Sequence, residues 1–389
     1  MRTREVMRGA ALVVMLGCAS SAESPPTDEA GYRAILAVPD YLEVPAIPSA
    51  NPPTAEKIAL GRRLFYDRRL SGNQTMACAG CHDQRRGFAD GLVHPIGSTG
   101  QGLRRNSPGL ANAVYHSTFT WANNGLRTLE DQLQVPIRND NPIELGVNDA
   151  NTPEVLARFD GDPSYARMFA AAFPDRAPGA TVEQISFALA SFCRTLVSAD
   201  SPYDRYLRGD KAAISDAAKR GAALFNGERL ECFHCHSGVN LTVSYRDFAS
   251  TEDTVRYAFF NNGLYNVDGT GGYPAQDQGL YDLTFQPNQR GRFRPPTLRN
   301  VAVTAPYMHD GSLATLTDVV RHYAAGGRVI ATGPDAGDGR LSPLKSPLVS
   351  GFQITDDEIA EVVAFLESLT DQGFLDNPAF SDPGAQPAP

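Results

Sequence analysis

The residues best suited to chemistry fall in two short segments, 78–82 and 232–236, and each segment spells Cys-x-x-Cys-His. Two thiols three residues apart can form thioether bonds to both vinyl groups of a haem, and the histidine that follows is then placed to bind the iron. The motifs therefore predict two covalently bound haem c groups. The expected ligands of these groups are Cys78, Cys81, His82, Cys232, Cys235 and His236.

Zinc binding and dithiol redox chemistry are the alternative interpretations of the paired cysteines. A structural zinc site needs four ligands that close around one ion, and thioredoxin-like chemistry needs no trailing histidine. Both therefore fit the motifs less well than haem. The other two cysteines, Cys18 and Cys193, are single, so the six give no pattern typical of a disulfide framework. We expect Cys193 to be a small buried apolar residue.

The amino terminus has the features of an export signal. Basic residues precede an apolar run at 10–16, and small residues follow it. We expect residues 1–22 to be a signal peptide and the mature protein to be periplasmic or anchored to the outer membrane. The segment 16–18, Leu-Gly-Cys, resembles the lipobox of bacterial lipoproteins, so a lipid anchor at Cys18 and plain cleavage both remain open.

Length and charge limit the other choices. The chain has 389 residues, enough for two domains, and its 42% apolar and 20% charged residues disfavour disorder. Its 35 basic and 44 acidic residues give a formal charge of −9, which favours neither nucleic acid nor an anionic membrane. A basic partner would fit this charge better.

A repeated helical pattern must position the two motifs. The sequence Gly-x-x-Leu-Phe at 61–65 recurs at 221–225, each time on an amphipathic stretch before a motif. We therefore expect a mainly α fold of two cytochrome c-like haem domains with long loops, joined by helical segments such as 181–196. The expected divisions are a signal peptide at 1–22, a Pro-rich tether and strap at 23–53, an amino-terminal peroxide-reactive haem domain at 54–205, a carboxyl-terminal haem domain at 206–376 and a loose tail at 377–389.

The second axial position of each iron decides what the protein can do. An electron carrier needs both irons six-coordinate, whereas an enzyme that reacts with peroxide needs one iron with an open distal face. Candidates for a distal ligand in the carboxyl half are Met308, His309, His322 and Tyr323. Their spacing alone does not select among them.

Longer motifs resemble those of one known superfamily, the bacterial di-haem cytochrome c peroxidases and MauG. The similar stretches are 105–108, 201–206, 296–300, 306–311 and 315–323. The resemblance runs from about residue 59 to residue 374, with both haem motifs in register. Within the superfamily, the stretches 120–123, 231–236 and 262–266 are similar to the MbnH branch, which is associated with methanobactin and copper-handling loci.

The resemblance implies the distal ligand of the carboxyl-terminal haem. It falls nineteen positions after Thr304, where the peroxidases have methionine and this chain, like MauG, has Tyr323. A phenolate stabilises ferric iron and higher oxidation states, whereas a thioether suits electron uptake from a cytochrome. Met308 is then a core residue beside the haem, although it could compete with Tyr323 for the iron.

The resemblance also implies an acid–base group on the open face of the amino-terminal haem. Splitting the O–O bond of peroxide needs a group that carries a proton from the inner to the outer oxygen. The family's distal glutamate matches Glu144 and its companion glutamine matches Gln132. The interval between them is slightly longer than in MauG, so Glu130 is an alternative, and both carboxylates could also be solvated loop charges.

Two further features come with the resemblance. Trp121, the only tryptophan of the chain, matches a residue that relays oxidising equivalents between the haems, with a core aromatic as the alternative. A calcium ion is expected between the domains, bound by the side chain of Asn106 and the carbonyls of Thr304 and Pro306. Such oxygen donors suit a hard cation.

Together these features predict a peroxide-dependent di-haem oxidase. The resemblance implies that hydrogen peroxide reacts at the His82 haem, that a high-valent state is shared by both haems, and that a side chain of a partner protein is oxidised. The expected substrate is a tryptophan of a copper-binding partner, converted to kynurenine. The alternatives are a cytochrome c peroxidase that takes electrons from a small cytochrome or cupredoxin, and a non-catalytic di-haem electron carrier.

Overall fold

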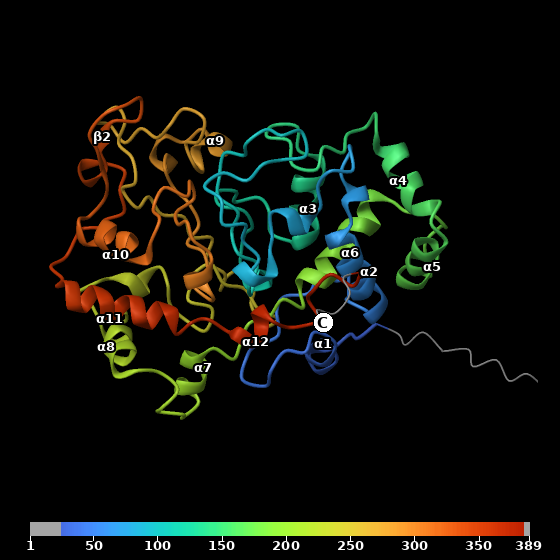
Figure 1. The fold of residues 1–389 in the computed structure, drawn as a ribbon, viewed down its shortest axis with the longest axis horizontal. Helices are drawn as coiled ribbons and strands as arrows, with labels where there is room; N and C mark the ends of the chain where they lie inside the picture. Colours follow the sequence, from blue (N-terminus) through green and yellow to red (C-terminus); the bar gives the residue numbers. More distant parts are fainter. Residues whose placement is uncertain (1–24, 385–389) are drawn as a thin grey trace, which may run out of the picture.

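The computed structural model describes residues 25–384, which form two mainly helical halves side by side (Figure 1). The helices up to residue 207 are α1 (Glu29–Ile35), α2 (Ala55–Tyr66), α3 (Leu129–Arg138), α4 (Thr152–Asp160), α5 (Pro163–Ala172), α6 (Val182–Cys193) and α7 (Pro202–Leu207). Those that follow are α8 (Asp216–Phe225), α9 (Tyr281–Thr284), α10 (Leu316–Ala324), α11 (Asp356–Glu367) and α12 (Gln372–Leu375). The predicted signal peptide, with Cys18, lies outside the described residues.

Long loops and single turns of 3-10 helix, labelled η, connect these helices. The turns are η1 (Arg68–Leu70), η2 (Cys78–Gly80), η3 (Gln84–Arg86), η4 (Ala113–Tyr115), η5 (Cys232–His234), η6 (Pro287–Gln289), η7 (Val301–Val303) and η8 (Gly339–Leu341). One short antiparallel pair of strands, β1 (Val329–Ile330) and β2 (Gly337–Asp338), is found within residues 25–384. In the same part of the chain, no helix has the length and apolar character needed to cross a membrane.

Each half is built on one close crossing of two helices. α2 packs against α6 in the first half, and α8 packs against α11 in the second. Gly61 lies at the first crossing, where an added Cβ atom would be 1.9 Å from the carbonyl oxygen of Ala188. Gly221 lies at the second, where an added Cβ atom would be 1.9 Å from the carbonyl oxygen of Glu361. The repeated glycine is needed because only a residue without a side chain lets the backbones approach so closely. The segment 181–196, expected to join the halves, contains α6 and supplies the second helix of the first crossing.

Two large hydrophobic cores correspond to these helix pairs, but the carboxyl terminus crosses between them. Phe374 and Phe380 are buried in the first core, and the Tyr66 hydroxyl donates to the Phe380 carbonyl oxygen at 2.6 Å. Arg62 Nε donates to the carbonyl of Ser381 at 2.7 Å. The expectation of a loose tail from residue 377 is therefore wrong up to this point, because buried phenylalanines return the chain to α2. Figure 1 shows this return beyond α11.

The segment before α2 also carries more structure than the expected tether and strap at 23–53. It contains α1, whose first turn is capped by the side chain of Asp28. Leu36, Val38 and Leu42 then pack with Ala199 in a small separate core. This strap was not visible as a helix in the sequence because its apolar residues are too few to show a period.

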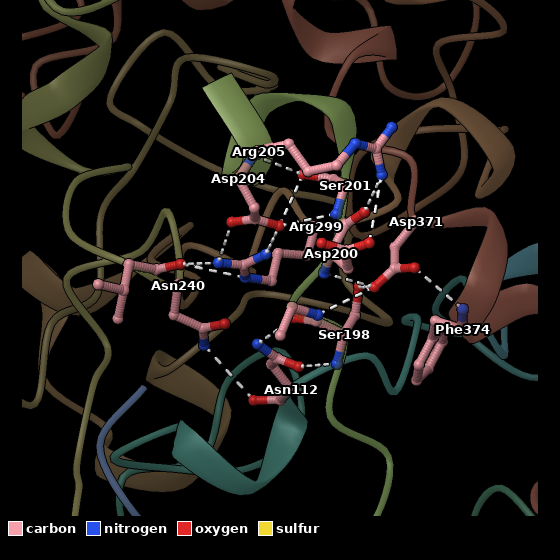
Figure 2. A network of polar contacts seen from close by, with 12 residues as sticks. Asn112, Ser198, Asp200, Ser201, Asp204, Arg205, Asn240, Arg299, Asp371 and Phe374 are labelled. Carbon is pink, nitrogen blue, oxygen red and sulfur yellow. Dashed lines mark hydrogen bonds and ion pairs between the residues drawn. The ribbon is translucent and has the colours of Figure 1, made fainter. Parts of the chain in front are cut away.

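Polar groups fix the chain between α6 and α7 against the second half (Figure 2). The carboxylate of Asp371 accepts hydrogen bonds from Ser198 Oγ at 3.1 Å and from the amide of Ala199 at 2.9 Å. Arg299 forms a buried two-point ion pair with Asp204, at 2.8 and 3.0 Å. These contacts hold the two halves, and with them the two Cys-x-x-Cys-His motifs, in a fixed relation.

Candidate active site

The first Cys-x-x-Cys-His motif forms η2 and then presents its histidine. Nδ1 of His82 lies 2.6 Å from the carbonyl oxygen of Phe88, so this nitrogen carries the proton and Nε2 is available to a metal. Burial lowers the pKa of His82, which keeps the ring in the neutral form that binds metals. Cys78 and Cys81 are both free thiols. The motif therefore has the donor set that a covalently bound haem needs.

The second motif repeats this arrangement at η5. His236 Nδ1 donates to the carbonyl oxygen of Leu241 at 3.2 Å, again leaving Nε2 available. Burial lowers the pKa of His236 to about 4. Cys232 and Cys235 are free thiols. The two motifs thus share one local geometry, which fits two c-type haems.

A cavity of about 240 Å³ opens beside the second motif and is lined by residues of both halves, among them His236, Trp121 and Tyr323. Tyr323 projects from α10, a helix that begins with a capping box between Thr315 and Asp318. Burial raises the pKa of the Tyr323 phenol to about 12. A hydrogen bond from the Asn262 side chain acts in the opposite direction and lowers it, but burial is the larger effect. The phenol therefore keeps its proton unless a cation such as ferric iron displaces it.

The other candidate distal ligands are placed differently. Met308 lines the same cavity, and Asn262 Nδ2 donates to its sulfur at 3.4 Å. His309 also lines the cavity. His322 Nε2 instead donates to the backbone carbonyl of Asn262 at 3.0 Å. The structure thus brings Tyr323, Met308 and His309 to one cavity, while His322 is used in backbone contacts.

Two buried side chains in this cavity were not expected from the sequence. His116 is 4% exposed and its Nε2 has no hydrogen-bond partner, while Arg294 is 3% exposed and pairs with no carboxylate within residues 25–384. Burial lowers the pKa of Arg294 to about 9. A buried cation beside an unpaired nitrogen suits an anionic group, and the propionates of a haem are such groups. The residues present therefore fit a haem here.

Glu144 lies in the loop after α3, beside the first motif. Burial raises the pKa of Glu144 to about 7. Burial, together with the charges of Asp90 and Glu144, raises the pKa of Cys81 to about 12, so the Glu144 carboxyl group lies near the thiol. The amide of Ser98 donates to the Glu144 backbone carbonyl at 2.7 Å and so fixes the loop. Glu144 can therefore take and release a proton near neutral pH at the first motif.

Glu130, the alternative carboxylate, is engaged elsewhere. Its two oxygens accept hydrogen bonds from the guanidinium of Arg194, each at 2.7 Å, and one also accepts from Asn51 Nδ2 at 2.6 Å. Burial would raise the pKa of Glu130, but Arg194 holds it below the ordinary value. This buried pair is structural, because removing either partner would strand a charge. Gln132, also on α3, has a buried Oε1 without a partner.

Trp121 lies where the two halves meet. Its indole Nε1 donates to the carbonyl oxygen of Asn106 at 2.8 Å, and its own carbonyl accepts from the amide of Arg294 at 2.8 Å. The ring packs against a cluster that includes Leu264 and Phe293 of the second half. The indole is thus held in one orientation at the cavity wall.

The three residues of the expected calcium site line this cavity too. Asn106 Nδ2 donates to the carbonyl of Leu92 at 2.7 Å, which leaves Oδ1 to face another group. Within residues 25–384, the carbonyls of Thr304 and Pro306 accept no backbone hydrogen bond. One amide oxygen and two unpaired carbonyls at one cavity suit a hard cation such as calcium.

Comparisons with known proteins show which family the chain resembles. Residues 55–212 match a family described as di-haem cytochrome c peroxidase. Cytochrome-c peroxidase IdrP1 of Denitromonas iodatirespirans is 36% identical over 338 residues, which cover 83% of this chain and 84% of that protein. Methylamine utilization protein MauG of Methylorubrum extorquens is 34% identical over 323 residues, which cover 83% and 80%.

A solved structure shares the whole fold. The crystal structure of a MauG-like protein associated with microbial copper homeostasis is 48% identical, with a TM-score of 0.86 over 89% of this chain and 98% of that one. This similarity confirms the expected fold class, mainly α with two cytochrome c-like haem domains and long loops.

Proposed function

Because the chain belongs to the di-haem cytochrome c peroxidase and MauG family, and is thus a di-haem oxidoreductase, we propose that it is a peroxide-dependent oxidase of a partner protein. The observation that carries this proposal is Tyr323, an oxygen donor in the cavity that His236 lines. The proposed substrate is a tryptophan of a copper-binding partner, converted to kynurenine. The 48% identical protein associated with copper homeostasis supports this choice of partner.

The two haems, attached at the two Cys-x-x-Cys-His motifs, supply the reduction of peroxide and the storage of its oxidising equivalents. Glu144 Oε takes the proton from the inner oxygen of hydrogen peroxide and returns it to the outer oxygen, which then leaves as water. Its pKa of about 7 suits both steps, since the same group must accept and release the proton. Gln132 offers a partner for the peroxide oxygens, because its amide is half-buried and its Oε1 is unpaired.

Trp121 is proposed as the relay between the two sites. An indole held at Nε1 and packed at the cavity wall loses an electron without moving far, so little reorganisation opposes the transfer. Since Trp121 is the only tryptophan of the chain, the tryptophan that is consumed belongs to another molecule. Tryptophan and two molecules of hydrogen peroxide give N-formylkynurenine and two of water, and hydrolysis then releases formate and leaves kynurenine.

Two further assignments belong to this proposal. Calcium is bound by Asn106 Oδ1 and the carbonyls of Thr304 and Pro306, where it fixes the loop that bonds to Trp121. The protein works in the periplasm or at the outer membrane, because the first residues are typical of an export signal and covalent haem attachment takes place outside the cytoplasm.

The test combines the holoprotein, hydrogen peroxide and a copper-binding protein from the same cell. Mass spectrometry of the partner should show loss of a tryptophan and gain of kynurenine only when all three are present. Glu144→Gln should slow the product at least about 100-fold, because a proton carrier is removed without a change of shape. Oxidation of a reduced small cytochrome with an unmodified partner would overturn the proposal.

That outcome corresponds to a second candidate, a cytochrome c peroxidase. The observation that favours it is Met308, whose sulfur lines the same cavity as Tyr323. A thioether ligand would raise the haem potential and suit electron uptake from a small cytochrome or cupredoxin.

A further inference from the structure

A second hollow, which we call the α9 groove, opens to the surface on the far side of the cavity wall. It has a volume of about 460 Å³ and is lined by residues of both halves. The lining residues that matter here are Arg127, Tyr257, Phe259, Phe260, Leu280 and Arg292. None of the sequence motifs pointed to it.

One layer of residues separates this groove from the cavity that holds Trp121. Phe260 lines both hollows. Its backbone pairs with that of Phe293 through two hydrogen bonds of 2.9 Å, and the next residue, Arg294, donates to the carbonyl of Trp121 at 2.8 Å. A group bound in the groove is therefore separated from the relay by Phe260 and the backbone segment paired with it, Phe293 and Arg294.

The groove is aromatic and cationic. Tyr257, Phe259 and Phe260 line it, and no acidic side chain does. The Arg127 guanidinium lies 4.3 Å from the Tyr257 ring centre and pairs at 3.3 Å with Glu252, a carboxylate that Arg246 shares at 3.2 Å. No carboxylate pairs with Arg292 within residues 25–384, so this charge is left for a ligand.

Exposed apolar side chains follow the groove wall along the chain. Leu280, in its wall, leads directly into α9, where Leu283 is 50% exposed, and Phe285 just beyond is 75% exposed. Large apolar side chains left in water beside a concave site are typical of surfaces that bind another protein. The groove therefore has an aromatic lining and a cation without a carboxylate partner, and exposed apolar residues follow its wall residue Leu280 in the chain.

We propose that the α9 groove docks the partner protein through an aromatic side chain flanked by carboxylates. The aromatic ring packs against the Phe260 wall and a flanking carboxylate pairs with Arg292. From there one electron passes from the docked ring to oxidised Trp121, which is reduced, while a flanking carboxylate takes the indole proton. The oxidation step rests on the proposed function above, but the docking step does not.

Binding is measured with the holoprotein and two fluorescein-labelled peptides, Glu-Glu-Trp-Glu-Glu and Lys-Lys-Trp-Lys-Lys. At low salt the acidic peptide should bind about tenfold more tightly by fluorescence anisotropy, and added salt should remove the difference. Arg292→Glu should weaken the acidic peptide about tenfold. Arg167→Glu, an exposed site on α5 with the same change of charge, should leave it unchanged.

Equal binding of the two peptides, or equal losses in the two variants, would overturn the proposal. Arg292→Gln and the salt titration of the unmodified protein give the same test without placing an acid in the groove. Oxidation is followed separately by mass spectrometry after peroxide is added. Binding without loss of the peptide tryptophan would refute the proposed function and leave the docking site standing, whereas oxidation that is equally fast in Arg292→Glu would refute the docking site.

Discussion

Glu144 connects the chemistry of one side chain to the pH dependence of the whole enzyme. Burial raises the pKa of its carboxyl group to about 7, well above the ordinary value for a glutamate. Since the carboxylate must be free to take a proton from peroxide, the rate of the peroxide reaction should rise with pH and level off above about 7. Stopped-flow mixing of the holoprotein with peroxide across this range measures the curve. A flat profile would contradict the assignment of Glu144.

The same pKa predicts a stability effect with a definite sign. The folded chain holds the Glu144 proton more tightly than the unfolded chain does. Protonation of Glu144 therefore adds to the free energy of unfolding at low pH, and this contribution is lost as the pH rises through about 7. Glu144→Gln, which has no proton to lose, should therefore gain stability relative to the original protein above pH 7. Thermal unfolding at two pH values, below and above 7, gives this comparison.

Asn262 contacts both proposed ligands of the second iron, and we expect it to govern which of the two can bind there. Its Nδ2 holds the sulfur of Met308 at 3.4 Å, its Oδ1 is buried without a partner, and a hydrogen bond from its side chain lowers the pKa of Tyr323. We expect Asn262→Leu to free the sulfur, so that a sulfur-to-iron charge-transfer band appears in the far-red spectrum of the ferric holoprotein. The spectral change should be large, because Asn262→Leu also removes the hydrogen bond that the Tyr323 phenol receives from Asn262.

Two matched variants test this reading of Asn262. Met308→Leu alone should leave the ferric spectrum unchanged, because Tyr323 is the expected ligand. The double variant Asn262→Leu/Met308→Leu should lose the new band. An unaltered spectrum in Asn262→Leu would show that the amide does not decide the ligand.

Residues that belong to a short motif could be foreseen, and residues defined by packing could not. The two Cys-x-x-Cys-His motifs follow directly from covalent geometry. His116, Arg294 and Asn262 follow no spacing rule, since each matters only because the fold buries it at the cavity. The roles of Glu144 and Glu130 could not be distinguished from the sequence for the same reason. The ion pair that makes Glu130 structural joins it to Arg194, which lies 64 positions away in the chain.

At the scale of elements, the helix crossings are the feature that the sequence repeat describes. A Cβ atom at Gly61 would lie 1.9 Å from the carbonyl oxygen of Ala188. Gly61→Ala should therefore force α2 and α6 apart and lower the free energy of unfolding by about 1–3 kcal/mol. Gly221→Ala should act in the same way on α8 and α11. Gly102→Ala is the control, since nothing lies within 4 Å of a Cβ atom there.

Thermal unfolding of the holoproteins measures these effects. If Gly61→Ala and Gly102→Ala melted at the same temperature, the close crossing would not limit stability. The repeat allowed α2 and α8 to be foreseen because both helices are amphipathic over three turns. α12 and the segment after it could not be foreseen, because four helical residues show no period and their partners lie far away in the chain.

At the scale of the whole molecule, function depends on how the two halves are held. The proposed relay through Trp121, the proposed calcium donors and the α9 groove all use residues from both halves, so each would require a fixed interface. The sequence identifies two halves through its repeat, but their relation depends on buried polar contacts between remote segments. Figure 2 shows that these contacts meet around Asp371 and Arg299.

Asp371 is the position where this interface can be weakened with least change of shape. One of its oxygens accepts from Ser198 Oγ, from the amide of Ala199 and from the amide of Asp200. Asp371→Asn removes the charge. When the amide oxygen of the asparagine faces away from these three donors, its NH₂ group faces them instead and cannot accept their hydrogen bonds. We expect the free energy of unfolding to fall by about 1.5–3 kcal/mol, since these are hydrogen bonds to a buried charge.

Hydrogen exchange should rise most in residues 372–381, which return the carboxyl terminus to α2. Asp376→Asn, at the exposed end of α12, removes the same charge from the same helix and should leave exchange unchanged. Equal exchange in the two variants would mean that burial of Phe374 and Phe380 alone holds the halves together.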